Sequence, residues 1–428
     1  MEENKLAAEN AAGEISAPIS GEKPPFSPSF REKIGAFLLY IAAYLYIDGL
    51  EGLKLLCFVL MFVALTELLN WEKPRRWESW VWLGCLAVIA AGILLGRARV
   101  WDDFSLLFLH IFAVWWALSR SGCLLEGESG HLLPFDAVNG FIVFPFRRFF
   151  LRIKTVWYTL AHLFRRKEKA KPATALWTAA ALLASGGLFV LAFRLLVDAD
   201  QGFASLISEK LLSWEIKIDG FVCFQILLSL PVGAYLFGLI AGSGREDREK
   251  LRLRGEHLCG VLNSLRKVPN LVWTILTGLF CLLYLLFFLV QTRYLFGAFT
   301  RSLPEGFIVS EYARQGFFEL CKVMAVNFAL LWLITRLSAR PVRENKPETA
   351  LCVVLLAESM LFAVIAFSKL LLYISCFGFT PLRLQSSWLV CVLFIGCVCA
   401  VYSLLSGRKS FRVWMMFGAV TLALLHLY

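Results

Sequence analysis

Residues 291–320 read QTRYLFGAFTRSLPEGFIVSEYARQGFFEL, a polar and aromatic segment between two strongly apolar stretches. The stretches on either side, residues 271–290 and 317–335, each approach the roughly 20 apolar residues that cross the hydrocarbon core of a bilayer. The sequence therefore predicts two membrane spans joined by a loop at residues 291–316. This loop holds the densest group of candidate functional side chains in the chain.

The composition of the whole chain is typical of a membrane protein. Of its 428 residues, 59% are apolar and only 18% are charged, whereas soluble domains are about 45–50% apolar. We predict an all-α integral membrane protein with a single polytopic membrane domain at residues 35–428. Residues 1–34 are polar and rich in turn formers, and we expect them to form a flexible cytoplasmic tail rather than a cleavable signal peptide.

About eleven transmembrane helices are expected from the apolar runs. The first two runs are joined by DGLEG at residues 48–52, which predicts a tight hairpin. With the amino terminus inside, 31 of the 43 Lys and Arg residues lie in inner segments and 8 in outer segments, as the positive-inside rule requires. The carboxyl terminus is then outside. The runs are residues 35–47, 53–69, 80–95, 104–118, 174–197, 220–241, 271–290, 317–335, 350–374, 386–405 and 413–428.

Several classes of function are disfavoured by the sequence. The net charge of +11 is explained by topology, so no nucleic-acid partner is expected. The twelve cysteines are spread singly and are interpreted as small apolar residues, and the five histidines lack metal-ligand spacing, so no metal or other cofactor is expected. A phosphate-binding loop and a GxSxG motif are also missing, which argues against ATP-driven transport by this chain alone and against familiar hydrolase chemistry.

The predicted inner loop at residues 119–173 contains FIVFPFRRFFLRIKTVWYTLAHLF. Its apolar residues recur at helical spacing while arginines mark another side, which indicates a basic amphipathic helix in the inner headgroup region of the lipid bilayer. The alternative is a long cytosolic extension of a span. Anionic headgroups are the expected neighbours of the amphipathic helix. The candidate headgroup contacts are Arg147, Arg148, Arg152 and Lys154.

A second basic cytoplasmic loop, residues 242–270, has seven Lys and Arg residues and predicts a short juxtamembrane helix. Both a protein partner and lipid contact are open for it. GILLG at residues 92–96 and GLIAG at residues 238–242 match the spacing of small residues that lets helices approach closely. We expect them to serve packing inside the chain rather than dimerisation.

Ionisable residues inside the expected spans are further candidates, because burying one costs about 2.5–3.5 kcal/mol on insertion scales. Lys322 and Lys369 lie near the outer ends of their spans, and we expect them to extend to the headgroups. Glu358 lies eight residues into its span and is the best buried candidate. Glu319 precedes Lys322 by three residues, a spacing that lets the two side chains pair.

Two predicted outer loops bring more polar residues to the same side. Glu311 and Arg314 belong to loop 291–316, and Arg383 belongs to loop 375–385. Together with the charges near the outer ends of the spans, they predict a polar cavity. The alternative is a set of salt bridges that only fixes the two loops against each other.

Three motifs carry a resemblance to a known family. YLFG at residues 294–297, EYARQGFFEL at residues 311–320 and FTPLR at residues 379–383 together resemble uncharacterised polytopic bacterial membrane proteins classed as a domain of unknown function, the DUF4153/DUF4173-like group. The resemblance covers roughly residues 269–383 and implies a bacterial inner-membrane protein without an assigned activity. It carries over no catalytic residue. The matching motif residues are Tyr294, Glu311, Tyr312, Arg314, Gly316, Glu319 and Arg383.

Three hypotheses for function follow. The first is a non-enzymatic envelope component, a sensor or membrane subunit that works with a membrane or signalling protein partner. The second is a secondary transporter of a small or lipid-like solute that uses Glu358 and the group Glu319, Lys322 and Lys369. The third is an enzyme acting on an envelope lipid, with Glu311 or Glu319 as the base.

Overall fold

The computed structural model describes residues 26–98, 100–101, 104–164, 220–291 and 309–428. Within these ranges the chain is helical, and its one β-type pairing is an isolated bridge between Val268 and Ser338. Most of the expected tail, the expected span at residues 174–197 and Tyr294 lie outside the described residues.

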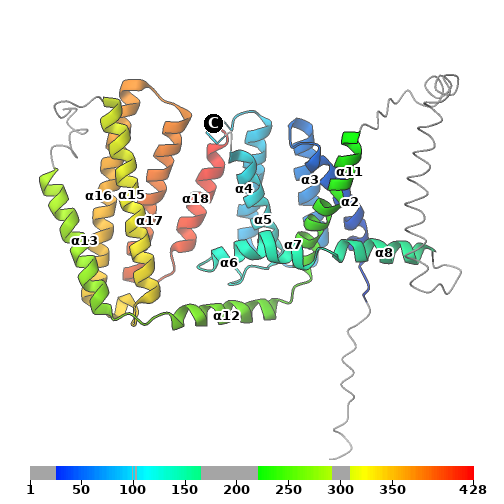
Figure 1. The fold of residues 1–428 in the computed structure, drawn as a ribbon, viewed down its shortest axis with the longest axis horizontal. Coiled ribbons are helices and arrows are strands. Elements are labelled where there is room, and N and C mark those ends of the chain that lie inside the picture. The colour runs from blue at the N-terminus through cyan, green and yellow to red at the C-terminus, as the bar shows by residue number, and fades with distance from the viewer. Residues whose placement is uncertain (1–25, 99, 102–103, 165–219, 292–308) are drawn as a thin grey trace, which may run out of the picture.

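The long helices stand side by side, and shorter helices cross one end of the bundle (Figure 1). We call this end, at the bottom of Figure 1, the basic face, because the segments there, residues 144–164 and 248–264, are rich in Lys and Arg. The crossing elements are α6 (Leu133–Val138), η2 (Asn139–Val143), α7 (Phe144–Arg147), α8 (Leu151–Phe164) and α12 (Arg248–Ser264), and the short turn η4 (Val342–Glu344) directly precedes Lys346. The upright helices are α2 (Phe30–Ile47), α3 (Gly52–Leu69), α4 (Trp77–Leu94), α5 (Ser105–Ser121), α11 (Gly220–Phe237) continued by η3 (Gly238–Gly242), α13 (Asn270–Val290), α15 (Val309–Leu337), α16 (Lys346–Phe377), α17 (Pro381–Ser406) and α18 (Phe411–Leu425).

Seven helical segments among the described residues are long and apolar enough to cross a membrane: Gly52–Leu69, Trp77–Leu94, Phe221–Gly242, Asn270–Val290, Gly316–Leu337, Lys346–Phe377 and Pro381–Ser406. The helices α5 and α18 are apolar but shorter, and α2 also coincides with an expected run. The protein is therefore an all-helical membrane protein. The count of about eleven spans and the orientation of the termini stay predictions.

The hairpin predicted at DGLEG is confirmed. The helix α2 ends at Ile47 and α3 begins at Gly52, and the two helices pack against each other. Gly49 has φ = 113° and Gly52 has φ = 48°, both in the left-handed region that glycine adopts without steric cost. The short link therefore reverses the chain between two antiparallel helices.

The upright helices form two groups, each with its own apolar core. The first group comprises α2 to α5 with α11, and its core is built around large buried side chains such as Trp116, Phe144 and Phe237. The second group comprises α13, α15, α16 and α17, with a core that includes Met324, Ile334 and Phe362. Separate cores mean that each group is held together by its own packing.

The last helix, α18, joins the two groups (Figure 1). On one side it meets α4, where a Cβ on Gly92 would clash with the backbone of His426. On the other side Trp414 stacks on Phe328 of α15 and packs against Gly396 of α17. GILLG therefore serves a close approach within the chain, as predicted, and in GLIAG Gly238 likewise lies against the backbone of Pro145.

The helix α8 lies at the level of the basic face, packs against α2 and α11, and extends outward past them (Figure 1). Its buried side carries Leu151, Arg152 and Thr155, whereas Ile153 and Leu160 are exposed. Because large apolar side chains exposed at the end of a membrane bundle favour the headgroup boundary, this arrangement is typical of an interfacial helix rather than of an extended span. Elsewhere on the basic face, α12 packs Leu251 and Gly255 against the segment that follows α5.

Candidate functional site

A cavity of about 320 Å³ lies between α13, α15 and α16, in the half of the second group that is distant from the basic face. We call it the Lys369 cavity. Most of its wall is apolar, and its charged members are one acid and one amine. Such a cavity suits a ligand with an apolar part and a charged group. The lining residues are Leu283, Tyr284, Phe287, Gly316, Glu319, Leu320, Val323, Phe362 and Lys369.

Lys369 is fully buried, with 0% of its surface exposed. The expectation that it extends to the headgroups is therefore wrong. The reason lies on α15, where Gly316 has no side chain: a Cβ there would lie 3.1 Å from Cδ and 3.2 Å from Cε of Lys369. The glycine of the GFFEL motif thus makes room for the lysine to cross the face of α15, and the negative charge of Glu319 attracts the amine.

The structure separates two residues that the sequence grouped together. Glu319 lines the Lys369 cavity from an exposed position, while Lys322, also exposed, is not among the lining residues. Within the described residues the two do not form an ion pair, although their spacing permits one. Glu319 and Lys369 therefore line the same cavity. Lys322, on the same helix as Glu319 but outside the cavity, is a suitable control for substitutions of Lys369.

A hydrogen-bonded chain crosses the middle of the second group. The Tyr284 hydroxyl donates to Oδ1 of Asn327 over 2.7 Å, and Nδ2 of Asn327 donates to Oγ of Ser359 over 2.8 Å. All three residues are buried. The sequence reasoning missed them, although Asn327 is the one amide within the apolar run 317–335 and could have been noticed.

Glu358 lies next to this chain on α16. Its carboxyl group is beside the Cys281 thiol, and its Oε2 atom is buried without a hydrogen-bond partner among the described residues. An acid in this position is costly to keep in a membrane bundle unless it meets a cation, a proton or water during function. Glu358 as a whole is half-buried, and Lys369 rather than Glu358 is the fully buried ionisable residue of α16 among those expected from the sequence.

The outer-loop candidates are placed only in part. Glu311, Tyr312 and Arg314 lie in the first turns of α15, which begins at Val309, and their side chains lie outside the described residues. Arg383 lies in the first turn of α17, where Nη1 donates to the carbonyl of Phe377 over 2.8 Å and to that of Gly378. Its guanidinium also lies 4.2 Å from the ring centre of Tyr373. Arg383 therefore fastens the turn between α16 and α17.

The headgroup candidates divide into exposed and internal residues. Arg147 and Arg148 pair with Glu246 at 3.4 Å and 3.2 Å, and Lys154 is exposed. Arg152 is buried and donates to the carbonyls of Ala36 over 2.9 Å and Leu230 over 3.3 Å. Its guanidinium therefore faces α2 and α11 instead of lipid.

A second buried polar cluster, which the sequence reasoning missed, lies in the first group at the basic face. Glu78 of α4, 1% exposed, accepts hydrogen bonds from Nε1 of Trp82 over 2.9 Å and from the backbone and hydroxyl of Ser129. Arg412 of α18 donates to Glu78 over 3.0 Å and also pairs with Glu128. We call these residues the Glu78 clamp, because they hold the start of α18 to the start of α4.

Asp136 of α6 lies close to the Glu78 clamp and is fully buried. Its Oδ1 accepts the backbone N–H of Leu125 over 2.9 Å, whereas Oδ2 has no hydrogen-bond partner among the described residues. Burial raises the pKa of Asp136 to about 7. No group of three or more His, Cys, Asp and Glu side chains that could hold a metal ion occurs in the described part of the chain.

The comparisons with known proteins address the family. Neither the curated proteins nor the solved structures include a significant match to this chain. The family model described as Domain of unknown function (DUF4153) matches residues 55–428, which include the second helical group, most of the first group without α2, the Glu78 clamp and the Lys369 cavity. The chain therefore belongs to the DUF4153 family.

Proposed function

We propose that this protein is a non-enzymatic component of a bacterial inner membrane that binds a small amphipathic ligand in the Lys369 cavity, as a sensor or membrane subunit. The observation that carries the proposal is the fully buried amine of Lys369 in the wall of a cavity of about 320 Å³ that is otherwise mainly apolar. A cation in the wall of a mainly apolar cavity attracts a ligand that carries a negative group beside an apolar part.

The charged and apolar residues of the wall indicate which parts of a ligand they would contact. Lys369 and Glu319 mark the charged part of the cavity, and Leu283, Phe287 and Phe362 supply its apolar part. An acyl or alkyl chain is suited to the apolar part, and an anionic or zwitterionic group to the charged part. The ligand class is therefore a lipid-like solute rather than a fully hydrated ion.

The proposal is tested by photolabelling the purified protein with a single-chain alkyl phosphate that carries a diazirine. Labelling of peptides containing Phe287 and Phe362 is expected to fall about tenfold in Lys369→Met, because the charge that pairs with the phosphate is removed. The matched control Lys322→Met removes a nearby cation on α15 that does not line the cavity. Equal labelling of Lys369→Met and the unaltered protein would rule out this ligand-binding site.

A secondary transporter is the second candidate, favoured by the polar residues within the second group. Tyr284 lines the Lys369 cavity, and its hydrogen-bond partners Asn327 and Ser359, with Glu358 beside them, continue from it into the bundle. Intramembrane acids of this kind commonly mark proton or solute pathways. If Glu358→Gln leaves both the cellular phenotype and the melting temperature unchanged, a pathway through Glu358 loses its main support.

The proposed topology places the basic face in the cytoplasm and the Lys369 cavity toward the outside, following the distribution of Lys and Arg. A cysteine introduced at position 309 should react with a membrane-impermeant maleimide in intact cells. Reaction only after permeabilisation would reverse the orientation. Crosslinking in the same cells tests for the membrane or signalling partner, because recovery of the chain alone would count against a subunit.

A further inference from the structure

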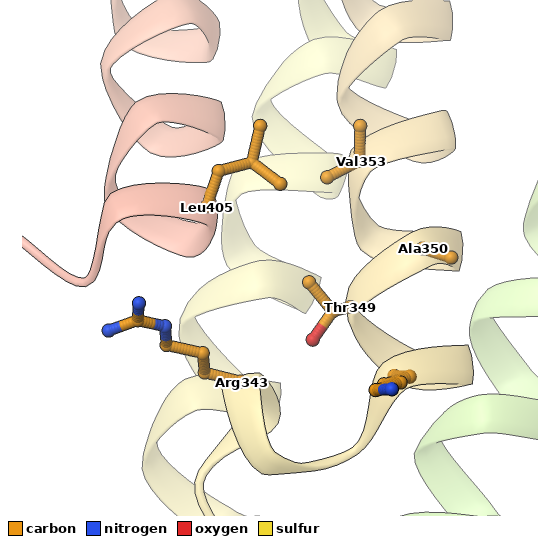
Figure 2. Close-up of a pocket in the computed structure, with 6 residues that line it drawn as sticks. Arg343, Thr349, Ala350, Val353 and Leu405 are labelled. Carbon is orange, nitrogen blue, oxygen red and sulfur yellow. The ribbon is translucent and has the colours of Figure 1, made fainter.

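A second hollow lies at the opposite end of the second group, where the basic face meets α16 and α17. Figure 2 shows Leu405 at the end of α17 facing Val353 of α16, with Thr349 and Arg343 below them. The hollow has a volume of about 370 Å³. We call it the α16–α17 groove. Its lining residues are Arg343, Lys346, Thr349, Ala350, Val353 and Leu405.

The groove has a charged end and an apolar end. Arg343 of η4 and Lys346 at the first position of α16 are exposed, and neither belongs to an ion pair among the described residues. Above them, Ala350, Val353 and Leu405 form an apolar strip, and Leu405 is 60% exposed. The hydroxyl of Thr349 donates to the carbonyl oxygens of Val342 and Asn345 and is therefore engaged locally.

Arg343 lies close to the chain where α17 ends. After α17 ends, Gly407 has φ = 72°, and a Cβ there would lie 2.8 Å from Cζ of Arg343. The glycine thus permits the guanidinium to lie close to the end of α17. Glu344, the acid next to Arg343 in sequence, is exposed but does not line the groove.

We infer that the α16–α17 groove binds an anionic phospholipid, with its phosphate on Arg343 and Lys346 and the upper part of an acyl chain along Val353 and Leu405. Charge complementarity carries this assignment, because two cations stand at the level where α16 begins and α17 ends, which is where phosphates of a bilayer lie. The apolar strip points from that level into the hydrocarbon region. The site is independent of the Lys369 cavity, which lies at the other end of the same helices.

The test uses the full-length protein in nanodiscs of phosphatidylcholine that contain phosphatidylglycerol and a trace of phosphatidylglycerol bearing a diazirine on its acyl chain. Crosslinks are mapped to peptides containing Val353 and Leu405. A cation near an anionic lipid surface changes binding about fivefold, so Arg343→Gln or Lys346→Gln should each reduce this labelling about fivefold and the double variant about 25-fold. The control Arg340→Gln removes an exposed cation of the same face that does not line the groove.

Two further arms identify the ligand. Excess unlabelled phosphatidylglycerol should compete with the crosslink, whereas excess phosphatidylcholine and inorganic phosphate should not. Competition by inorganic phosphate would show a free-anion site and overturn the lipid assignment. Labelling that falls equally in Arg340→Gln and in the double variant would show general attraction to the basic face, and would overturn the groove as a specific site. Circular dichroism of each variant confirms that the helices remain folded.

Discussion

The first helical group holds the buried acid Glu78 and its partner Arg412 at the basic face, whereas the second group carries Glu358 and Lys369 within the bundle itself. In the first group, Glu78 is surrounded by donors from α4, α18 and the segment after α5. In the second group, Lys369 lines a cavity and Glu358 has a buried oxygen without a hydrogen-bond partner among the described residues.

The two groups therefore differ in how their charged residues can act. Those around Glu78 stabilise the fold, and those at the Lys369 cavity are placed to bind a ligand. Donors that saturate an acid fix the geometry of the chain and leave little capacity for a ligand. Charged groups that line a cavity can form ion pairs or hydrogen bonds with a ligand that enters it. The first group and the Glu78 clamp therefore act as a scaffold, and the second group holds the candidate binding site.

The largest effect is expected from breaking the Glu78 clamp. Arg412→Met leaves the buried carboxylate of Glu78 without its cation, which should lower the free energy of unfolding by about 3–5 kcal/mol. The melting temperature in detergent, followed by tryptophan fluorescence, measures this change. Lys409→Met is the control, because Lys409 is 76% exposed in side chain and pairs loosely with Glu126 at 3.7 Å. Equal melting temperatures for the two variants would contradict the structural role of the clamp.

The second prediction concerns the cost of burying the carboxylate of Asp136, whose Oδ2 atom has no hydrogen-bond partner among the described residues. Because its pKa is raised to about 7, above the usual value near 4, ionisation disfavours the folded state. The penalty is absent below about pH 4, grows as the pH rises, and is complete above about pH 7. Asp136→Asn should therefore stabilise the protein at pH 8, by up to about 4 kcal/mol.

Thermal unfolding across pH 5–8 checks the sign for Asp136. The advantage of Asp136→Asn over the unaltered protein should shrink steadily as the pH falls. A constant difference at all pH values would mean that the substitution acts through packing and not through the charge of the carboxyl group.

The third prediction concerns the space that Gly316 leaves for the side chain of Lys369. Gly316→Ala places a methyl group against the Lys369 side chain, and overpacking of this kind costs about 1–3 kcal/mol. Displacement of Lys369 should also reduce labelling of the Lys369 cavity by the alkyl phosphate. The control is Gly278→Ala on α13, where a Cβ would meet its nearest neighbour, Leu351, at an ordinary 3.6 Å. Unchanged labelling in Gly316→Ala would show that the absence of a side chain at Gly316 is not needed for ligand binding in the Lys369 cavity.

The helices were predictable because each span is a local signal. Runs of apolar residues near the length of a bilayer identify them, and the two glycines of DGLEG identify the first turn. A helix within residues 119–173 was also predictable, because helical spacing is a local signal, whereas its contact with lipid headgroups stays a prediction. The family could be recognised for the same reason, since its motifs are contiguous.

The site was less predictable because its contacts join distant residues. Arg412 and Glu78 are separated by 334 positions, so nothing in either neighbourhood indicates the pair. Lys369 was expected at the headgroups because its position in the span permitted it, and only the absence of a side chain at Gly316 on another helix explains its burial. Such effects depend on tertiary packing, which no periodicity records.

The smallest expected effect comes from breaking the hydrogen bond between Tyr284 and Asn327 in the second group. Tyr284→Phe removes the donor to Asn327 and should lower the free energy of unfolding by about 1 kcal/mol. Adding Asn327→Leu removes the amide left without that donor and should recover part of the loss, because two apolar partners carry no unsatisfied polar group at this contact. Melting temperatures of the single and double variants measure this coupling. If the double variant regains stability but its Lys369 cavity is labelled less by the alkyl phosphate than in the unaltered protein, the polar chain contributes to the site that Tyr284 lines. If labelling returns with stability, the chain serves only to hold α13, α15 and α16 together.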